Sequence, residues 1–153
     1  MSATAHQGAA AADRTAEQAE RDIAACQRLT VEFARAIDER LPERLRQIFT
    51  DDCVFERRGE RVHGIDALIA SQSARAADIH TLHLCVNACV DLVGADQAGG
   101  TSYFTLYRHV GALPGPLGPP EVIGRYRDLY RRTPDGWRIA ERTAQALLRA
   151  ATR

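Results

Sequence analysis

The clearest pattern of apolar and polar positions lies between residues 79 and 110. Two runs of alternating residues, rich in β-branched and aromatic side chains, flank a polar segment that contains glycine. This period of two predicts two long strands in an antiparallel hairpin with its turn near Asp96. The expected opposed pairs are His83 with His109, Cys85 with Tyr107 and Asn87 with Thr105. Opposed side chains lie about 4.5–5.5 Å apart, so we expect both histidines on one face, with an amide and a phenol beside them.

A different spacing precedes this hairpin. Apolar residues recur at three and four positions between about 18 and 39 and predict a helix with one apolar stripe. The stripe consists of Ile23, Cys26, Leu29, Phe33 and Ile37. Pro42 suits the first turn of a second, short helix. A short strand is expected around Cys53 to Arg57, and a third helix from Ile65 to about Ala76.

The C-terminal part predicts a second hairpin. Residues 111–120 contain too many prolines to join a sheet, and residues 133–136 have the composition of a hairpin turn between two strands. Helices followed by a run of strands predict an α+β domain, with helices on one face of a curved antiparallel sheet. We expect a single domain over residues 18–150. Residues 1–17 lack large apolar side chains and are expected to form a disordered tail.

Composition narrows the class of partner. The chain has 20 basic and 20 acidic residues, which gives no global support for a nucleic-acid or anionic-membrane partner. No apolar run reaches the length of a membrane span, and the N-terminus does not resemble a secretory signal. The four cysteines form no C-x-x-C pair, so we expect reduced thiols in a cytoplasmic protein.

Several segments resemble those of SnoaL-like proteins in the nuclear transport factor two-like superfamily. They are AIDERLPERLRQIFTDDCVFER, GIDALIA, HLCVN and GRYRDLYRRTPDGWRIAERTA, and together they cover about residues 20–148. The resemblance implies a cone-shaped cavity between a curved antiparallel or mixed sheet and three N-terminal helices, commonly in a dimer. The superfamily includes dehydratases, ketosteroid isomerases, polyketide cyclases and epoxide hydrolases, and members with no known chemistry.

Among these proteins, the chain most resembles cofactor-free dehydratases of the scytalone and bile-acid kinds. Asp38 and His83 match their aspartate near the end of the first helix and their strand histidine, and His109 matches a second histidine of scytalone dehydratase. The sequence also departs from the family at several positions: Phe33 and Arg57 replace tyrosines, and Gly124 and Tyr126 replace polar residues. The general base of ketosteroid isomerases is absent, which favours dehydration over isomerisation.

Dehydration of a β-hydroxy carbonyl compound needs a base for the carbon-bound proton and an acid for the departing hydroxyl. We expect His83 to be the base, Asp38 to orient it and His109 to be the acid. The other expected binding residues are Asn87, Tyr107 and Tyr126 for a carbonyl, Phe33 and Phe55 for an apolar ring, and Asp128, which could instead form a structural ion pair. The expected substrate is a small hydrophobic, cyclic hydroxy-carbonyl compound, with neither metal nor cofactor.

Two further classes of function stay open: a polyketide cyclase or steroid-type isomerase, and a binding or interaction module without chemistry. Each histidine alone could also be a satisfied structural residue. If the His83 face lines a cavity, the opposite face is left apolar and uncovered. The residues of that face are Leu84, Val86, Ala88 and Val90. We therefore expect a homodimer formed through the sheet.

Overall fold

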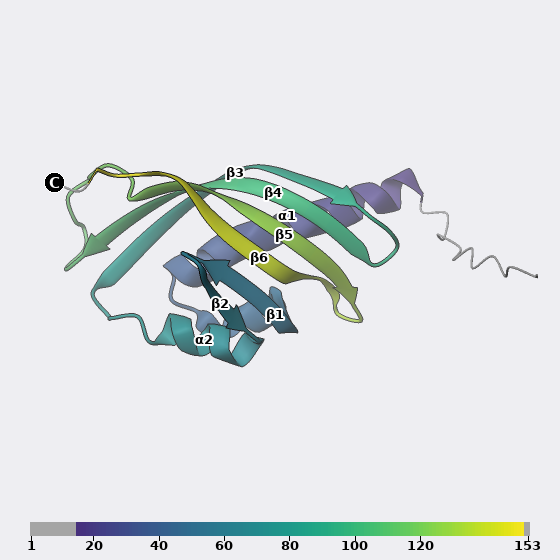
Figure 1. Cartoon of the computed structure of the whole chain (residues 1–153), viewed down its shortest axis with the longest axis horizontal. Coiled ribbons are helices and arrows are strands. Elements are labelled where there is room, and N and C mark those ends of the chain that lie inside the picture. Colours follow the sequence, from purple (N-terminus) through teal and green to yellow (C-terminus); the bar gives the residue numbers. More distant parts are fainter. Residues whose placement is uncertain (1–14, 152–153) are drawn as a thin grey trace, which may run out of the picture.

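The structure is a computed structural model that describes residues 15–151. Its elements in chain order are α1 (Ala16–Asp38), the 3₁₀ helix η1 (Pro42–Gln47), β1 (Phe49–Arg57), β2 (Glu60–His63), α2 (Ile65–Ser73), β3 (Ile79–Leu92), β4 (Gln97–Val110), β5 (Val122–Thr133) and β6 (Gly136–Arg149). The strands form one mixed sheet in the order β2-β1-β6-β5-β4-β3, in which only β1 and β6 are parallel. The helices lie on one side of this curved sheet (Figure 1). The predicted α+β class is confirmed.

Helix α1 forms where the three-and-four spacing predicted it. The Thr15 side chain caps its start by accepting a hydrogen bond from the backbone N–H of Gln18 at 3.1 Å. The apolar stripe packs into the core, where Cys26, Phe33 and Ile37 are almost fully buried. The tail expected over residues 1–17 falls mostly outside the described residues, and Ala16 and Glu17 already belong to α1.

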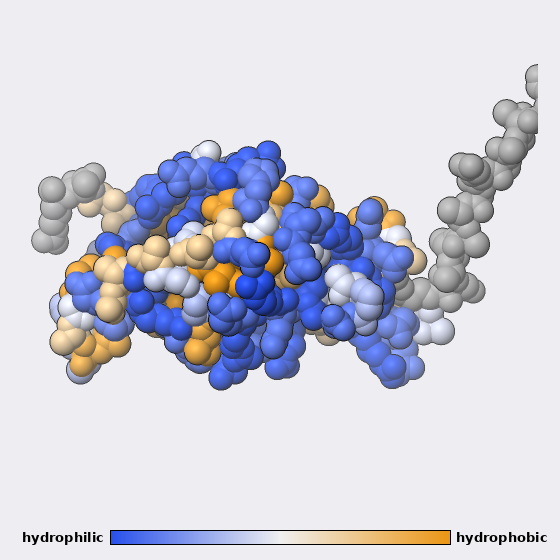
Figure 2. All heavy atoms as spheres, turned by 90° about the horizontal axis from the view of Figure 1, so that it is seen from below, coloured by the Kyte–Doolittle hydropathy of each residue, from blue (hydrophilic) through white to orange (hydrophobic). Residues whose placement is uncertain are grey.

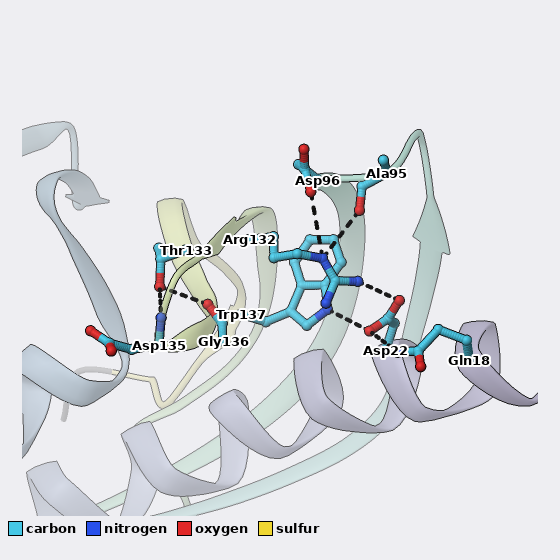
Figure 3. A network of polar contacts seen from close by, with 9 residues as sticks. All are labelled: Gln18, Asp22, Ala95, Asp96, Arg132, Thr133, Asp135, Gly136 and Trp137. Carbon is cyan, nitrogen blue, oxygen red and sulfur yellow. Dashed lines mark hydrogen bonds and ion pairs between the residues drawn. The ribbon is translucent and has the colours of Figure 1, made fainter. Parts of the chain in front are cut away.

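Within the core, one polar cluster fastens α1 to the sheet (Figure 3). The Asp22 carboxylate on α1 is buried and accepts a hydrogen bond from Trp137 Nε1 at 3.0 Å. It also pairs with Arg132, whose guanidinium lies 4.6 Å from the centre of the Trp137 ring. Burial alone would raise the pKa of Asp22, but the bonds from Trp137 and Arg132 hold that pKa below its usual value.

The register of the β3–β4 hairpin differs from the prediction. His83 lies opposite Leu106, whereas His109 lies opposite His80. A bulge between Val86 and Cys89 causes the difference, and Asn87 there has a φ of 53°. An extra residue on one strand reverses which face each side chain beyond it occupies. The expected pairing of His83 with His109 is therefore wrong.

Other boundaries shift modestly. The short hairpin strand β2 was not predicted, and the second helix is a single 3₁₀ segment.

All four cysteines are free. Among the described helices, none is both long and apolar enough to cross a membrane. One face of the molecule is mostly hydrophilic, with hydrophobic side chains gathered near its middle (Figure 2).

Candidate active site

The structure brings Asp38 and His83 together. Asp38 is the last residue of α1, and its Oδ1 lies 2.7 Å from His83 Nδ1. Its Oδ2 accepts the backbone N–H of His83 at 2.7 Å, and the Thr81 hydroxyl donates to Oδ1 at 2.9 Å. The two side chains are only 14% and 9% exposed. Three hydrogen bonds therefore fix the carboxylate against one strand, and the imidazole against the carboxylate.

This contact also selects the tautomer of His83. An ionised carboxylate only accepts hydrogen bonds, so Nδ1 carries the proton and Nε2 keeps its lone pair. The rings of Phe33 and Phe104 lie 6.5 and 6.3 Å from the imidazole, centre to centre, and limit its rotation. The imidazole is thus a positioned base with one basic nitrogen.

His83 lines a cavity of about 840 Å³ between the sheet and the helical segments. This volume lies within the range of sites for small organic ligands, about 300–1,000 Å³. Phe33, Phe55 and Tyr126 also line the cavity. The further aliphatic and aromatic lining residues are Ile37, Ile79, Phe104, Leu106 and Val122. One wall is therefore suited to an apolar, ring-shaped molecule.

Tyr126 combines an apolar ring with a hydrogen-bond donor. Its ring stacks on Phe104 at 4.3 Å between centres, and the phenol is almost fully buried. Burial raises the pKa of Tyr126 far above its usual value, so the hydroxyl keeps its proton at neutral pH. A neutral phenol in this wall can donate a hydrogen bond to a carbonyl oxygen or an oxyanion.

Asp128 lies beneath this wall, outside the cavity lining. Its carboxylate accepts from Arg142 Nε and Nη2, each at 2.7 Å, and from the Tyr130 hydroxyl at 2.9 Å. Arg142 is fully buried and stacks against Tyr126 at 4.2 Å. Of the two roles considered for Asp128, the ion pair is the one its contacts show.

Three other residues lie away from the cavity. The His109 ring contacts the loop after β4, and its Nε2 lies 3.1 Å from the carbonyl oxygen of Ala112. Tyr107 lies opposite Leu82 on the same, outer face of the sheet. Asn87 is exposed in the bulge. The predictions that these residues act on a ligand beside His83 are wrong, because all three depended on an uninterrupted hairpin.

Sequence reasoning missed several polar residues of the cavity. Arg75 and Thr81 line it, as do Arg57 and Arg108. Of these, the resemblance had marked only Arg57, as a replacement of a family tyrosine, although the alternation of β3 already places Thr81 on the same face as His83. Among the described residues, no group of three or more histidine, cysteine, aspartate or glutamate side chains could hold a metal ion.

A curved sheet, helices on one side and a cavity between them define an α+β cone of the nuclear transport factor two-like class. The chain belongs to the SnoaL-like domain family, whose sequence profile matches residues 18–143. Comparison with curated protein sequences finds no match.

Solved structures share this fold at low sequence identity. A scytalone dehydratase-like protein from Novosphingobium aromaticivorans is 19% identical, with a TM-score of 0.76 over 91% of this chain and 94% of that one. An NTF2-like protein with a cystatin-like fold from the same organism is 23% identical, with a TM-score of 0.75 over 88% of each chain. A hexachlorocyclohexane dehydrochlorinase (LinA) of type 2 is 19% identical, with a TM-score of 0.74 over 90% of this chain and 91% of that one. At these identities the likeness establishes the fold.

Proposed function

We propose that the protein is a cofactor-free lyase that removes water from a hydrophobic, cyclic hydroxy-carbonyl compound. The observation that carries this proposal is the Asp38–His83 pair, which presents one basic imidazole nitrogen at the wall of a partly apolar cavity. Two of the solved structures that share this fold are named for elimination reactions, one as a dehydratase and one as a dehydrochlorinase, and this supports the lyase proposal.

In this reaction His83 Nε2 removes the proton from the carbon next to the carbonyl group. The electrons of the C–H bond move into the carbonyl, and the Tyr126 phenol donates a hydrogen bond to the resulting enolate oxygen. Asp38 stabilises the imidazolium that forms. When the enolate collapses, the C–O bond to the hydroxyl breaks, and Nε2 returns its proton to that oxygen so that water leaves. His83 therefore serves first as base and then as acid, and it takes the acid role that the sequence pattern predicts for His109.

The experiment compares two histidine variants on a panel of cyclic β-hydroxy ketones, with products identified by mass spectrometry. His83→Ala should lower turnover by about 10²–10⁴-fold, the usual contribution of a positioned acid–base group. His109→Ala is the matched control and should keep turnover, because its ring contacts the outer loop. Full turnover by His83→Ala would refute the proposal, and a product isomeric with the substrate would show cyclisation or isomerisation instead.

Dimerisation through the sheet is the second part of the proposal. On the outer face of β3, Leu82, Leu84 and Val86 are 54%, 50% and 54% exposed, and Tyr103 on β4 lies opposite Val86. A row of exposed apolar side chains on a sheet is typical of a surface covered by another chain. Val90 does not extend this row, because the bulge turns it inward to 9% exposure.

A further inference from the structure

Arg75, just beyond the end of α2, is an unusual cation within the cavity lining. Its Nη1 makes a long hydrogen bond of 3.4 Å to the Thr81 hydroxyl. Its Nε and Nη2 are buried, and neither has a hydrogen-bond partner among residues 15–151. Buried guanidinium nitrogens are normally paired, because leaving a charged donor unpaired costs more than leaving a neutral one unpaired.

These two nitrogens have a defined geometry. Nε and Nη2 form one edge of the planar guanidinium and present two parallel N–H groups that match the two oxygens of a carboxylate. Arg142 uses the same edge in this protein, since its Nε and Nη2 each hold one Asp128 oxygen at 2.7 Å. The corresponding edge of Arg75 is therefore complementary to a carboxylate rather than to a single oxygen atom.

The surroundings of Arg75 also favour an anion. Burial, followed by the charge of Arg40, lowers the pKa of the Arg75 guanidinium, and Arg57 and Arg108 act in the same direction. Both Arg57 and Arg108 line the same cavity. The Asp38 carboxylate raises the pKa of Arg75 but does not cancel the downward shift, so a bound anion would relieve the remaining repulsion between these cations.

Arg75 is also connected to the catalytic pair. Its Nη1 contacts the Thr81 hydroxyl, which donates to the same Asp38 oxygen that holds His83. Arg75 also borders a smaller cavity of about 240 Å³, but Thr81 lines only the large one. Arg75 is therefore linked through Thr81 and Asp38 to the imidazole, and all three of Arg75, Thr81 and His83 line the large cavity.

We infer that Arg75 binds a carboxylate of the substrate through Nε and Nη2, so that the lyase substrate is a hydrophobic, cyclic hydroxy-ketone that carries an acid group. This inference rests on the proposed function, because it takes the cavity beside His83 to be the substrate site. The carboxylate is an anchor separate from the reacting carbonyl. A carboxylate would not activate its own α-proton, since the enolate would then carry a second negative charge next to the first.

A binding experiment tests this inference without turnover. The probes are 2-naphthoate and 2-naphthamide, two planar molecules of the same size that differ in the charge of one group. Binding is measured by calorimetry at about 0.15 M ionic strength, where long-range attraction is largely screened. The wild-type protein should bind 2-naphthoate about ten-fold or more tightly than 2-naphthamide, as expected for hydrogen bonds to a charged group.

Three variants test whether Arg75 causes the preference for 2-naphthoate. Arg75→Gln should abolish it, and Arg75→Lys, which keeps the charge without the paired donors, should retain only part of it. Arg108→Gln is the matched control: it lines the same cavity but already lies 4.0 Å from Glu121, so the preference should survive. Should Arg75→Gln fail to give a cooperative thermal melt, Arg75→Lys carries the test. No preference in the wild type, an undiminished preference in the Arg75 variants, or an equal loss in Arg108→Gln would overturn the inference.

His83→Ala separates this result from the lyase proposal. It should keep the preference for 2-naphthoate, because His83 does not contribute the charge that binds the anion. A retained preference together with unchanged turnover would leave the carboxylate site standing and remove the lyase. If His83→Ala loses turnover and the wild-type protein shows no preference for 2-naphthoate, the lyase proposal stands and the carboxylate site is refuted.

Discussion

The buried pair of Asp128 and Arg142 allows the sharpest prediction about stability. Burial alone would lower the pKa of Arg142, and the Asp128 carboxylate more than offsets this effect, so the guanidinium stays charged in the core. Asp128→Asn would leave that charge buried without its carboxylate. Removing one member of a buried ion pair typically costs about 3–5 kcal/mol of unfolding free energy. In a domain of this size, that corresponds to a fall in Tm of about 6–20 °C.

Urea denaturation of matched variants measures this cost. The control is Glu39→Gln, which removes one charge from an exposed pair with Arg35 on α1, where the loss should be below about 1 kcal/mol. The double variant Asp128→Leu/Arg142→Met should recover much of the stability, because it removes both buried charges and fills a similar volume. If Asp128→Asn lowers the free energy of unfolding no more than Glu39→Gln does, the buried pair does not stabilise the core.

Three further predictions concern other parts of the molecule. Asp22→Asn should lower the free energy of unfolding in urea at neutral pH. The difference from wild type should shrink as the pH falls below about 4, because protonation removes the stabilisation that comes from the lowered pKa of this carboxyl. Gly124→Ala should lower the free energy of unfolding by about 1–3 kcal/mol in thermal melting, because its Cβ would lie 2.3 Å from the Phe104 ring and 2.7 Å from a backbone oxygen. Gly99→Ala is the control, because the space around its Cβ is open. Leu84→Glu should give a monomer in light scattering if the sheet face forms a dimer, and a wild type that is monomeric at all concentrations would contradict this.

Most of the elements, and the faces that carry Asp38 and His83, could be anticipated because they depend on local periodicity. The spacing of the apolar stripe in α1 fixes the direction in which Asp38 projects, and alternation along β3 fixes the face of His83. These two signals need no knowledge of how far one strand is shifted against another. The resemblance to SnoaL-like proteins then supplied the one long-range fact, that the end of the first helix lies against this strand.

The register of the hairpin was beyond this kind of reasoning. The residue numbers of opposed pairs total 190 beside the turn and 189 beyond the bulge, against the expected 192. Displacing the turn by one residue keeps every side chain on its predicted face, whereas a single extra residue at Asn87 exchanges the faces. Asparagine tolerates a positive φ better than most residues, but an asparagine within an alternating run is too weak a signal to predict a bulge.

The equal numbers of acidic and basic residues also concealed the charge of the cavity. Net charge bears on the far field of a protein, whereas a ligand in a cavity responds to the few charges within a Debye length and to how deeply they are buried. Arg57, Arg75 and Arg108 come from three separate segments that meet at this cavity only after the sheet curves over α1 and α2. A neutral composition therefore gives no global support for a polyanionic partner such as nucleic acid, but is compatible with a small anion held by one half-buried guanidinium.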